Sequence, residues 1–402
     1  MRIAADADQP QLQPGLPMRI AYVTETWPPE LNGVSLTVER TVRYLRSRGH
    51  LVELIRPRQP DEAPLDASDE FRSAGCVIPM YPDLRFGLAL PGALKERFRQ
   101  SRPELVHLAT PGPLAWAALL AARSLGIATT SDFRTNFHQY SRHYGLGFLA
   151  GPVLGLLRRF HNLTHRTFVP TQASRRELTR AGVQHISVVG RGVDTARFSP
   201  AARSPALRAS WQAGEETPVF LAVGRVAAEK NVELGLRAFE AARRLRPDLR
   251  MVVVGDGPAR ERLTAAHPAA SFVGAKRGAD LAAHYASADA FLFPSLSDTF
   301  GNVVMEALAS GLPVVAFDCA AAAEHVVDGR SGRVVVPGDE DAFIAAAAAL
   351  AVAPHELQPM RDAAVAAARR ATWDEVLERF ESRLQDTVDA AEPSPEHVPA
   401  VA

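Results

Sequence analysis

Two acidic residues eight positions apart, Asp298 and Glu306, frame a Phe-Gly-Asn turn in the stretch Ser295-Leu-Ser-Asp-Thr-Phe-Gly-Asn-Val-Val-Met-Glu. The pattern after the turn is typical of a helix that ends at Gly311 and leads into a buried strand from Pro313. A turn that presents free backbone N–H groups at a helix N-terminus binds anions. Carboxylates on both sides would accept hydrogen bonds from hydroxyls but would repel a phosphate. We therefore expect a ligand in which a sugar is joined to a phosphate.

A second polar segment, Gly224-Arg-Val-Ala-Ala-Glu-Lys230, follows an apolar run and opens a helical pattern. Open α/β sheets bind ligands at such strand-to-helix turns. The chain has 42 Arg but only three Lys, so a lysine rather than an arginine at position 230 is unusual for this chain. A compact ammonium approaches phosphate as a point charge. We expect Arg225 and Lys230 to neutralise a diphosphate, although a solvated cation at a helix start would give the same pattern.

The stretch 295–315 resembles the donor-binding signature of retaining, nucleotide-sugar-dependent glycosyltransferases of family 4. In that family both acidic positions are usually Glu. Here the first acidic position is Asp298. In this respect the chain resembles a subgroup that includes GDP-mannose-dependent α-mannosyltransferases and relatives of sulfoquinovosyl transferases. The resemblance implies the GT-B fold, an α/β fold with two facing, doubly wound Rossmann-like domains.

The same resemblance implies a hexosyltransferase. It would move a hexose, with mannose favoured, from a nucleotide-diphosphate sugar to a lipid or glycan hydroxyl, in glycolipid or polysaccharide biosynthesis. The configuration at the anomeric carbon would be retained, because the acceptor attacks from the leaving-group side and no carboxylate nucleophile is required.

The resemblance also implies a role for each motif residue. Asp298 would bind the hexose hydroxyls, assisted by the N–H groups of Phe300 and Gly301, and Glu306 would bind the ribose hydroxyls. The expected donor-binding residues are Asn32, Gly33, Gly224, Phe300, Gly301, Asn302, Val303 and Glu306. The expected catalytic residues are Arg225, Lys230, Asp298, Arg134 and His138.

Some of these assignments depend on the first half of the chain. Gly33 links an apolar run to a helical pattern and could let the backbone approach the donor phosphate, although a simple turn glycine is the alternative. Many relatives carry a histidine two positions before Asn136, where this chain has Arg134 and offers His138 further on. Either Arg134 contacts the donor or His138 reaches the site from the next helical turn. We expect both to line it.

The spacing of aspartates argues against a bound metal. Asp-x-Asp arrangements start only at Asp6 and Asp339, and neither is placed to hold a metal diphosphate. We therefore expect metal-independent catalysis without a cofactor. Arg225, Lys230 and the helix N-terminus near Asn302 would stabilise the leaving group, at about 2–4 kcal/mol for each donor. The alternatives are a nucleotide-sugar epimerase of the same fold, which needs no acceptor, and a non-catalytic sugar-nucleotide-binding protein, which needs no phosphate cations.

Two series of strands and helices have to position these residues. Near-continuous apolar runs alternate with helical patterns, which is typical of parallel sheets covered on both faces. Strands are expected at 18–24, 51–55, 104–108, 127–131, 167–170 and 186–189, then at 218–223, 250–254, 271–273, 290–293, 314–316 and 333–336. We expect a disordered extension (1–17), an acceptor domain (18–195), a nucleotide-sugar donor domain (196–372), a helix that packs on the first domain (373–388) and a disordered tail (389–402).

One apolar segment, 145–160, ends in Arg158 and Arg159. It could lie in a membrane interface with its arginines on the headgroups, or form a buried helix, which is the favoured interpretation.

Residues 1–195 carry 24 Lys and Arg against 17 Asp and Glu, so this half could meet an anionic partner such as a lipid surface, or the asymmetry could have no function. No basic run interleaves with aromatic residues, so nucleic acid is not an expected partner.

The composition is that of a globular protein with two domains, with 402 residues, 47% hydrophobic and 22% charged. No apolar run approaches the roughly 20 residues that span a bilayer. The start of the chain lacks the pattern of a secretory signal. Cys76 and Cys319 are expected to be buried thiols in a reducing compartment. The expected location is therefore the cytoplasm, with possible peripheral contact at the inner face of the membrane.

Overall fold

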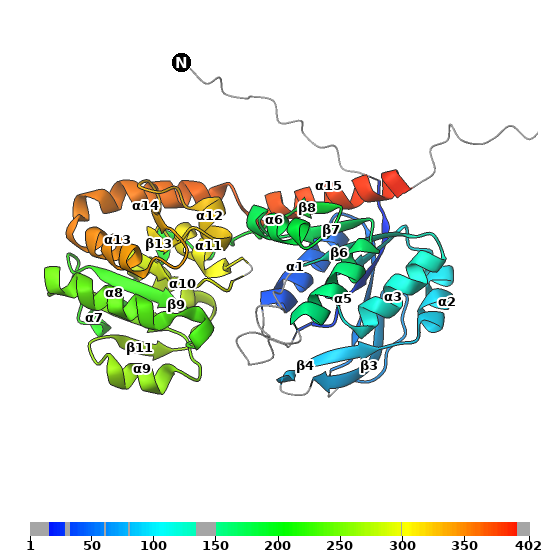
Figure 1. The fold of residues 1–402 in the computed structure, drawn as a ribbon, viewed down its shortest axis with the longest axis horizontal. Coiled ribbons are helices and arrows are strands. Elements are labelled where there is room, and N and C mark those ends of the chain that lie inside the picture. Colours follow the sequence, from blue (N-terminus) through cyan, green and yellow to red (C-terminus); the bar gives the residue numbers. More distant parts are fainter. Residues whose placement is uncertain are drawn as a thin grey trace, which may run out of the picture. The chain divides into compact units, whose positions relative to one another are not determined.

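The computed structural model describes residues 16–28, 33–59, 62–78, 81–133, 150–298 and 300–391 (Figure 1). Its strands form two sheets. The first sheet contains β1 (Arg19–Val23), β2 (Leu51–Pro57), β3 (Glu70–Ile78), β4 (Tyr81–Leu88), β5 (Leu105–Leu108), β6 (Ala128–Asp132), β7 (Arg166–Val169) and β8 (Ile186–Val188). The second contains β9 (Val219–Val223), β10 (Arg250–Val254), β11 (Ser271–Gly274), β12 (Ala290–Phe293), β13 (Val314–Phe317) and β14 (Gly332–Val335).

Helices connect the strands within each series. Those among the first strands are α1 (Gly33–Ser47), α2 (Pro91–Ser101), α3 (Pro113–Ser124), α5 (Ala150–Asn162) and α6 (Gln172–Arg180). They are followed by η2 (Pro200–Ala202), α7 (Pro205–Ser210), η3 (Ala228–Lys230), α8 (Val232–Leu245), α9 (Arg260–Ala266), α10 (Gly278–Ser287), α11 (Asn302–Ala309), α12 (Ala320–His325), α13 (Glu340–Val352), α14 (Pro354–Arg369) and α15 (Trp373–Ala391).

The strand order is that of doubly wound sheets. It is β4-β3-β2-β1-β5-β6-β7-β8 in the first sheet and β11-β10-β9-β12-β13-β14 in the second. Every pairing in the second sheet is parallel. The α/β fold class expected from the sequence, with two parallel-sheet domains, is confirmed.

One part of the first sheet was not expected. β3 and β4 pair antiparallel at the sheet edge. Their sequences, EFRSAGCVI and YPDLRFGL, mix charged, apolar and glycine residues, because an edge strand need not be covered on both faces. Neither strand contains the continuous apolar run that is typical of a strand buried on both faces.

The strands of the second sheet alternate between two buried clusters, because successive strand residues point to opposite faces. The first apolar cluster contains Val219, Leu221, Phe291 and Phe293 from the strands, with Tyr285 of α10, Val304 and Leu308 of α11 and Ala364 of α14. The second apolar cluster contains Phe220, Ala222, Leu292 and Phe317, with Phe239 of α8 and Phe343 of α13. Helices therefore cover both faces of the sheet.

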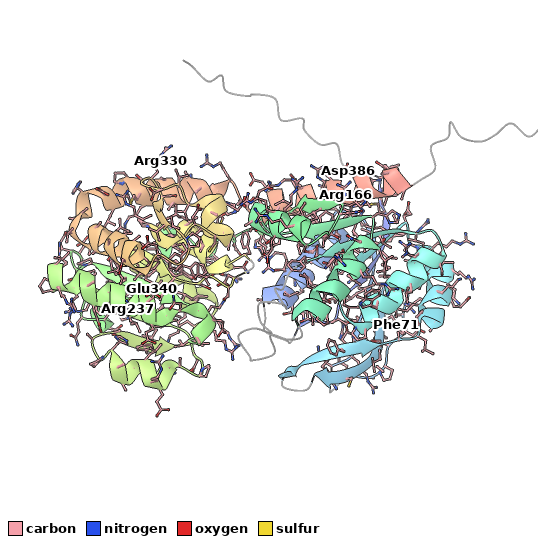
Figure 2. All side chains as sticks on the ribbon, in the orientation of Figure 1. Phe71, Arg166, Arg237, Arg330, Glu340 and Asp386 are labelled. Atoms are coloured by element: carbon pink, nitrogen blue, oxygen red, sulfur yellow. The ribbon has the colours of Figure 1, made fainter. Side chains whose placement is uncertain are left out.

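The outer surface of the second cluster is closed by the packing of α8 against α13. Arg237 of α8 and Glu340 of α13 form an ion pair there, with an Nη1–Oε2 distance of 2.6 Å, and Figure 2 shows the two side chains together. Both side chains are about half exposed, so the pair contributes little to stability.

Contacts divide the chain into two compact units. One comprises the described residues up to Thr130 and those from Phe380 on, and the other comprises Ser131–Arg379. In the first unit, Glu381 of α15 accepts hydrogen bonds from the hydroxyl of Tyr44 and from Nε2 of His50, each at 2.9 Å. The end of α15 thus packs on the unit that contains β1. The domain limits expected from the sequence remain predictions.

Two expectations about buried segments need correction. α5 is not a buried helix, because Leu157 and Phe160 are buried whereas Leu156, Arg158 and Arg159 are exposed. The cysteines are not both buried either. Cys76 is exposed on the edge hairpin, and Cys319 is partly exposed. None of the described helices is both long enough and apolar enough to cross a membrane.

Candidate active site

The two polar motifs of the second sheet emerge at the same edge. β9 and β12 are parallel neighbours, with Leu221 opposite Phe291. Gly224 directly follows β9, and Ser295 lies two positions after the end of β12. The carboxyl ends of parallel strands are where open α/β sheets bind ligands. The sheet therefore brings the two motifs together.

Lys230 and Asp298 form the centre of this edge. Nζ of Lys230 donates to Oδ1 of Asp298 at 2.6 Å, and Oγ of Ser295 donates to Oδ2 of Asp298 at 2.6 Å. Ser297 donates to the carbonyl oxygen of Glu229 at 2.8 Å, which ties the loop after β12 to η3. The carboxylate of Asp298 is therefore held through both of its oxygens.

Arg225 has an acidic partner of its own. Its Nη1 lies 3.6 Å from Oε1 of Glu229, and its side chain is 53% exposed. Two cations are thus matched by two carboxylates, and the four groups together carry no net charge. A bound anion would therefore depend on N–H donors and backbone dipoles as much as on the cations. An ammonium has three N–H donors, so the bond to Asp298 leaves Lys230 with two for a ligand.

The loop after β9 is fixed by a close backbone approach. Gly255 has φ +147°, and a Cβ on it would lie 1.8 Å from the carbonyl oxygen of Gly224. The N–H of Val226 donates to the carbonyl oxygen of Asp256 at 2.9 Å. Only glycine fits at position 255, because any side chain would push the loops after β9 and β10 apart.

α11 begins beside Asp298 with an open N-terminus. Its N-cap, Gly301, has φ +86°, the left-handed region that favours glycine. Among the described residues no side chain caps this end, so the N–H groups of the first turn can bind an anion. The turn itself is rigid, because Phe300 is buried and its carbonyl oxygen accepts the N–H of Ala321 at 2.7 Å. Asn302 is the first helical residue rather than the cap.

Glu306 lies about one turn further along α11. Its Oε2 accepts a hydrogen bond from the hydroxyl of Tyr285 at 2.9 Å. Burial raises the pKa of Glu306, while the hydrogen bond from Tyr285 and the charge of Arg197 lower it. Val303, on the same helix, packs against the first apolar cluster. Glu306 is thus a partly buried carboxylate with a defined partner, not a solvated helical glutamate.

Two residues that the sequence analysis missed hold the two carboxylates. Ser295 binds Asp298, and Tyr285 binds Glu306. Ser295 stands inside the motif, three positions before Asp298, and this short spacing is a signal that could have identified it. Tyr285 is 21 positions from Glu306 on another helix, and nothing in its local sequence marks it.

Cys319 lies beside the same edge, directly after Asp318. Its Sγ is 3.7 Å from the carbonyl oxygen of Ser295. Burial, together with the charges of Asp298 and Asp318, raises the pKa of this thiol to about 11. Cys319 is therefore protonated at neutral pH and is a poor nucleophile.

The expected site residues of the first half are only partly described. Asn32, Arg134 and His138 lie outside the described residues, and Gly33 is the first residue of α1. The roles given to all four stay predictions.

A residue that the sequence did not single out is well defined in this half. Glu25, two positions after β1, accepts the backbone N–H groups of Gly87 at 2.5 Å and of Leu114, at the start of α3, at 2.9 Å. Burial raises the pKa of Glu25 to about 7, although these hydrogen bonds oppose the shift.

Side chains that could bind a metal ion are not clustered in the described residues. In the parts of the chain that the structure describes, no three His, Cys, Asp or Glu side chains lie together in a way that could hold a metal ion. Metal-independent catalysis stays a prediction.

Comparison with known proteins agrees with this architecture. Residues 31–197 match the family described as Glycosyltransferase Family 4, and residues 217–352 match the one described as Glycosyl transferases group 1. A GDP-mannose-dependent alpha-mannosyltransferase of Mycobacterium tuberculosis is 35% identical over 93% of this chain and 99% of its own length. A sulfoquinovosyl transferase of Arabidopsis thaliana is 30% identical over 83% of this chain and 68% of its own.

A solved structure gives the same fold. The sucrose-phosphate synthase of Thermosynechococcus elongatus superposes with a TM-score of 0.72 at 18% identity, over 93% of this chain and 100% of that one. The fold and the matched families define the protein as a glycosyltransferase enzyme of the GT-B fold, as the sequence predicted. With a relative 35% identical over nearly its whole length, the chain belongs to glycosyltransferase family 4.

Proposed function

We propose that the protein transfers a mannosyl residue from GDP-mannose to a hydroxyl of a lipid or glycan, with retention of the anomeric configuration. The donor is supported by the relative named as a GDP-mannose-dependent alpha-mannosyltransferase, which matches 93% of this chain. The observation that carries the proposal is the ion pair of Lys230 and Asp298 beside the open N-terminus of α11. It provides cation, carboxylate and peptide donors at one edge.

The diphosphate of the donor would occupy the space between Lys230 and the N-terminus of α11. The two remaining N–H donors of Lys230 and the first-turn N–H groups of the helix would bind its oxygens. The side chain of Arg225 is exposed and could rotate toward the diphosphate, since its contact with Glu229 is long, at 3.6 Å. These donors would stabilise the charge that develops as the nucleoside diphosphate leaves.

Asp298 would bind the hexose. Its oxygens each have a lone pair left after the bonds with Lys230 and Ser295, and a carboxylate can accept about four hydrogen bonds. Hydroxyls of the sugar can therefore reach the same carboxylate that orients Lys230. Sugar recognition and leaving-group stabilisation would then be coupled through one side chain.

Replacement of Lys230 tests this assignment. In Lys230→Ala the turnover with GDP-mannose should fall by about a hundredfold or more, as for the loss of one transition-state donor. The matched control is Lys95→Ala, which removes a lysine of α2 and should leave turnover unchanged. Thermal unfolding of both variants checks the fold. Full activity in Lys230→Ala would refute the site.

We propose that no metal ion takes part. The aspartate spacing and the donors described above support this, because they provide the charge stabilisation that a metal would otherwise supply. Turnover should persist in EDTA and should change little when Mg²⁺ or Mn²⁺ is added. Strict dependence on either ion would overturn this part of the proposal.

The identity of the donor can be tested directly. Thermal-shift measurements with GDP, UDP and ADP should show the largest stabilisation with GDP, because a ligand stabilises only the folded state that binds it. Turnover with GDP-mannose should then exceed turnover with UDP-glucose or ADP-glucose. Conversion of a nucleotide sugar without acceptor would instead indicate an epimerase, and binding without turnover would indicate a non-catalytic protein. Membership of family 4 favours the transferase over both.

The acceptor side would meet a membrane surface at the cytoplasmic face. α5 supports this contact, since it exposes Leu156 next to Arg158 and Arg159 while its other face is buried. An exposed apolar residue followed closely by two cations is suited to the headgroup region of anionic lipid. A lipid acceptor could thus be bound at the surface where it resides, without contact with nucleic acid.

A further inference from the structure

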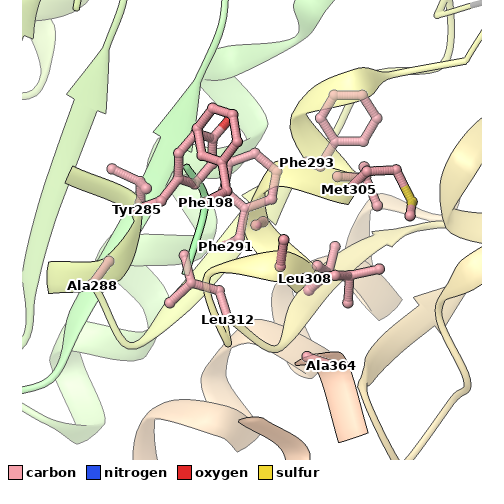
Figure 3. Close-up of a cluster of buried hydrophobic side chains, with 14 of the residues drawn as sticks. Phe198, Tyr285, Ala288, Phe291, Phe293, Met305, Leu308, Leu312 and Ala364 are labelled. Atoms are coloured by element: carbon pink, nitrogen blue, oxygen red, sulfur yellow. The ribbon is translucent and has the colours of Figure 1, made fainter. Parts of the chain in front are cut away.

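Tyr285 of α10 is a fully buried tyrosine whose hydroxyl has a charged partner. The ring lies in the first apolar cluster, edge-on to Phe198 with centroids 5.6 Å apart and tilted against Phe291 at 5.7 Å (Figure 3). These contacts fix the ring. The hydroxyl donates to Oε2 of Glu306 at 2.9 Å.

Packing alone does not require a hydroxyl at this position. A phenylalanine would fill the same space between Phe198 and Phe291, and burial of a polar group costs free energy unless it is hydrogen-bonded. Replacing a buried polar pair by apolar groups of similar shape is often neutral for stability. The hydroxyl is therefore better explained by what it does to Glu306 than by the stability of the cluster.

Glu306 has one oxygen committed and one available. Of the described residues only Tyr285 donates a hydrogen bond to it, and that bond engages Oε2. The residue is partly buried, and Oε1 has no hydrogen-bond donor among the described residues, so this oxygen remains for a ligand. Without the bond the side chain would be free to change its rotamers, and ordering it on binding would cost entropy.

We infer that Tyr285 is a positioning residue for the donor nucleotide, whose hydroxyl holds Glu306 in the orientation that receives the ribose hydroxyls. The inference rests on the proposed function, in which Glu306 binds the ribose. Tyr285 does not touch the ligand and acts through Glu306. The recognised chemistry is a vicinal diol next to a diphosphate.

The experiment compares nucleotides that differ only in ribose hydroxyls. Binding of GDP, 2′-deoxy-GDP and 3′-deoxy-GDP is measured by calorimetry for the wild type, Tyr285→Phe and Glu306→Gln. The wild type should bind GDP about tenfold tighter than at least one deoxy analogue, the size expected for a hydrogen bond to a charged group. In Tyr285→Phe, GDP affinity should fall about tenfold while affinity for that analogue changes less than about twofold.

A matched control comes from the other compact unit. Tyr44→Phe removes an equivalent bond, since the hydroxyl of Tyr44 donates to Oε2 of Glu381, also at 2.9 Å. This variant should bind all three nucleotides as the wild type does. In turnover, Tyr285→Phe should raise the donor KM about tenfold with kcat nearly unchanged. This result indicates the loss of an interaction that stabilises the bound substrate and the transition state equally.

A double-mutant cycle excludes a purely structural effect. If Tyr285 acts through Glu306, Tyr285→Phe should have little further effect on GDP affinity in the Glu306→Gln background. Equal losses for all three nucleotides, or a Tyr285→Phe variant that fails to fold, would assign the hydroxyl to stability and overturn the inference. Unchanged discrimination in Tyr285→Phe would also overturn it while leaving the proposed function intact. A wild type that binds all three nucleotides equally would refute the ribose role of Glu306, and the inference with it.

Discussion

Lys230 and Asp298 are 68 positions apart in sequence, yet Nζ of the lysine lies 2.6 Å from Oδ1 of the aspartate. The pair joins the loop after β9 to the loop after β12. The two side chains were expected to serve different parts of the ligand, the diphosphate and the hexose. Their contact means that a change at one alters the charge and the position of the other.

Asp298→Asn separates these two effects. It removes one negative charge from a set of four groups that is neutral in the wild type, so binding of GDP should be unchanged or tighter. Turnover should fall by about thirtyfold or more, because the amide forms weaker hydrogen bonds to the hexose in the transition state. Calorimetry with GDP and initial rates with GDP-mannose give the two numbers. Parallel losses of binding and turnover would show that Asp298 serves only to hold Lys230.

Gly255→Ala should disrupt the donor site through its backbone. The new Cβ would meet the carbonyl oxygen of Gly224 at 1.8 Å, so the loops after β9 and β10 must separate. We expect a loss of about 3 kcal/mol in the free energy of unfolding, together with loss of GDP binding. Gly278→Ala is the matched control. Gly278 also has positive φ, +55°, but its Cβ would enter open space, so the cost should be about 1 kcal/mol. Equal losses in urea unfolding would contradict the role of the close approach.

Glu25 should make stability depend on pH. Its pKa is raised from 4.5 to about 7 in the folded protein by burial, so the folded state favours the protonated form. The stabilising contribution is complete below about pH 4.5 and is lost as the pH rises through about 7, a change of about 3 kcal/mol. Between pH 5 and pH 8 the wild type should therefore lose unfolding free energy relative to Glu25→Gln. Urea titrations of both proteins at several pH values measure the difference, and parallel curves would argue against a raised pKa.

The exposed face of α5 should determine binding to anionic membranes. Reversal of both charges in Arg158→Glu/Arg159→Glu should weaken binding to vesicles that contain phosphatidylglycerol by at least about tenfold, since each basic residue near such a surface contributes about 1 kcal/mol. The control is Arg175→Glu/Arg176→Glu, which reverses an adjacent, exposed arginine pair on α6. Sedimentation with vesicles measures both. Equal weakening in the two variants would indicate a general charge effect instead of a contact made by α5.

The prediction of the second sheet from the sequence was accurate because its strands are buried on both faces. Runs such as Val219–Val223 and Ala290–Phe293 consist almost only of apolar residues, and helical patterns separate them. The edge hairpin of β3 and β4 was missed for the opposite reason. Its sequence mixes charged and apolar residues, and its described side chains are mostly only partly buried, so its pattern resembles that of a loop.

Within the candidate site, the sequence identified the chemical groups but not their partners. Asp298, Glu306 and Lys230 could be recognised from residue type, spacing and resemblance to family 4. The bonds of Ser295 and Tyr285 to the carboxylates could not, because hydrogen bonds depend on side-chain directions that local patterns do not contain. The sequence also did not predict that the positive charges of Arg225 and Lys230 are each paired with a carboxylate. Their partners are Glu229 and Asp298.

The amino-acid sequence by itself determined the fold class and the enzyme family, and it supplied the candidate residues of the site. Those properties follow from apolar periodicity and from short motifs, whose members are neighbours in the chain. Tertiary structure alone decided that Lys230 is paired with Asp298, that Glu306 accepts a hydrogen bond from a buried tyrosine, and that α5 exposes its arginines. Each of these depends on which side chains the packed sheet and helices bring within hydrogen-bonding distance or leave in solvent.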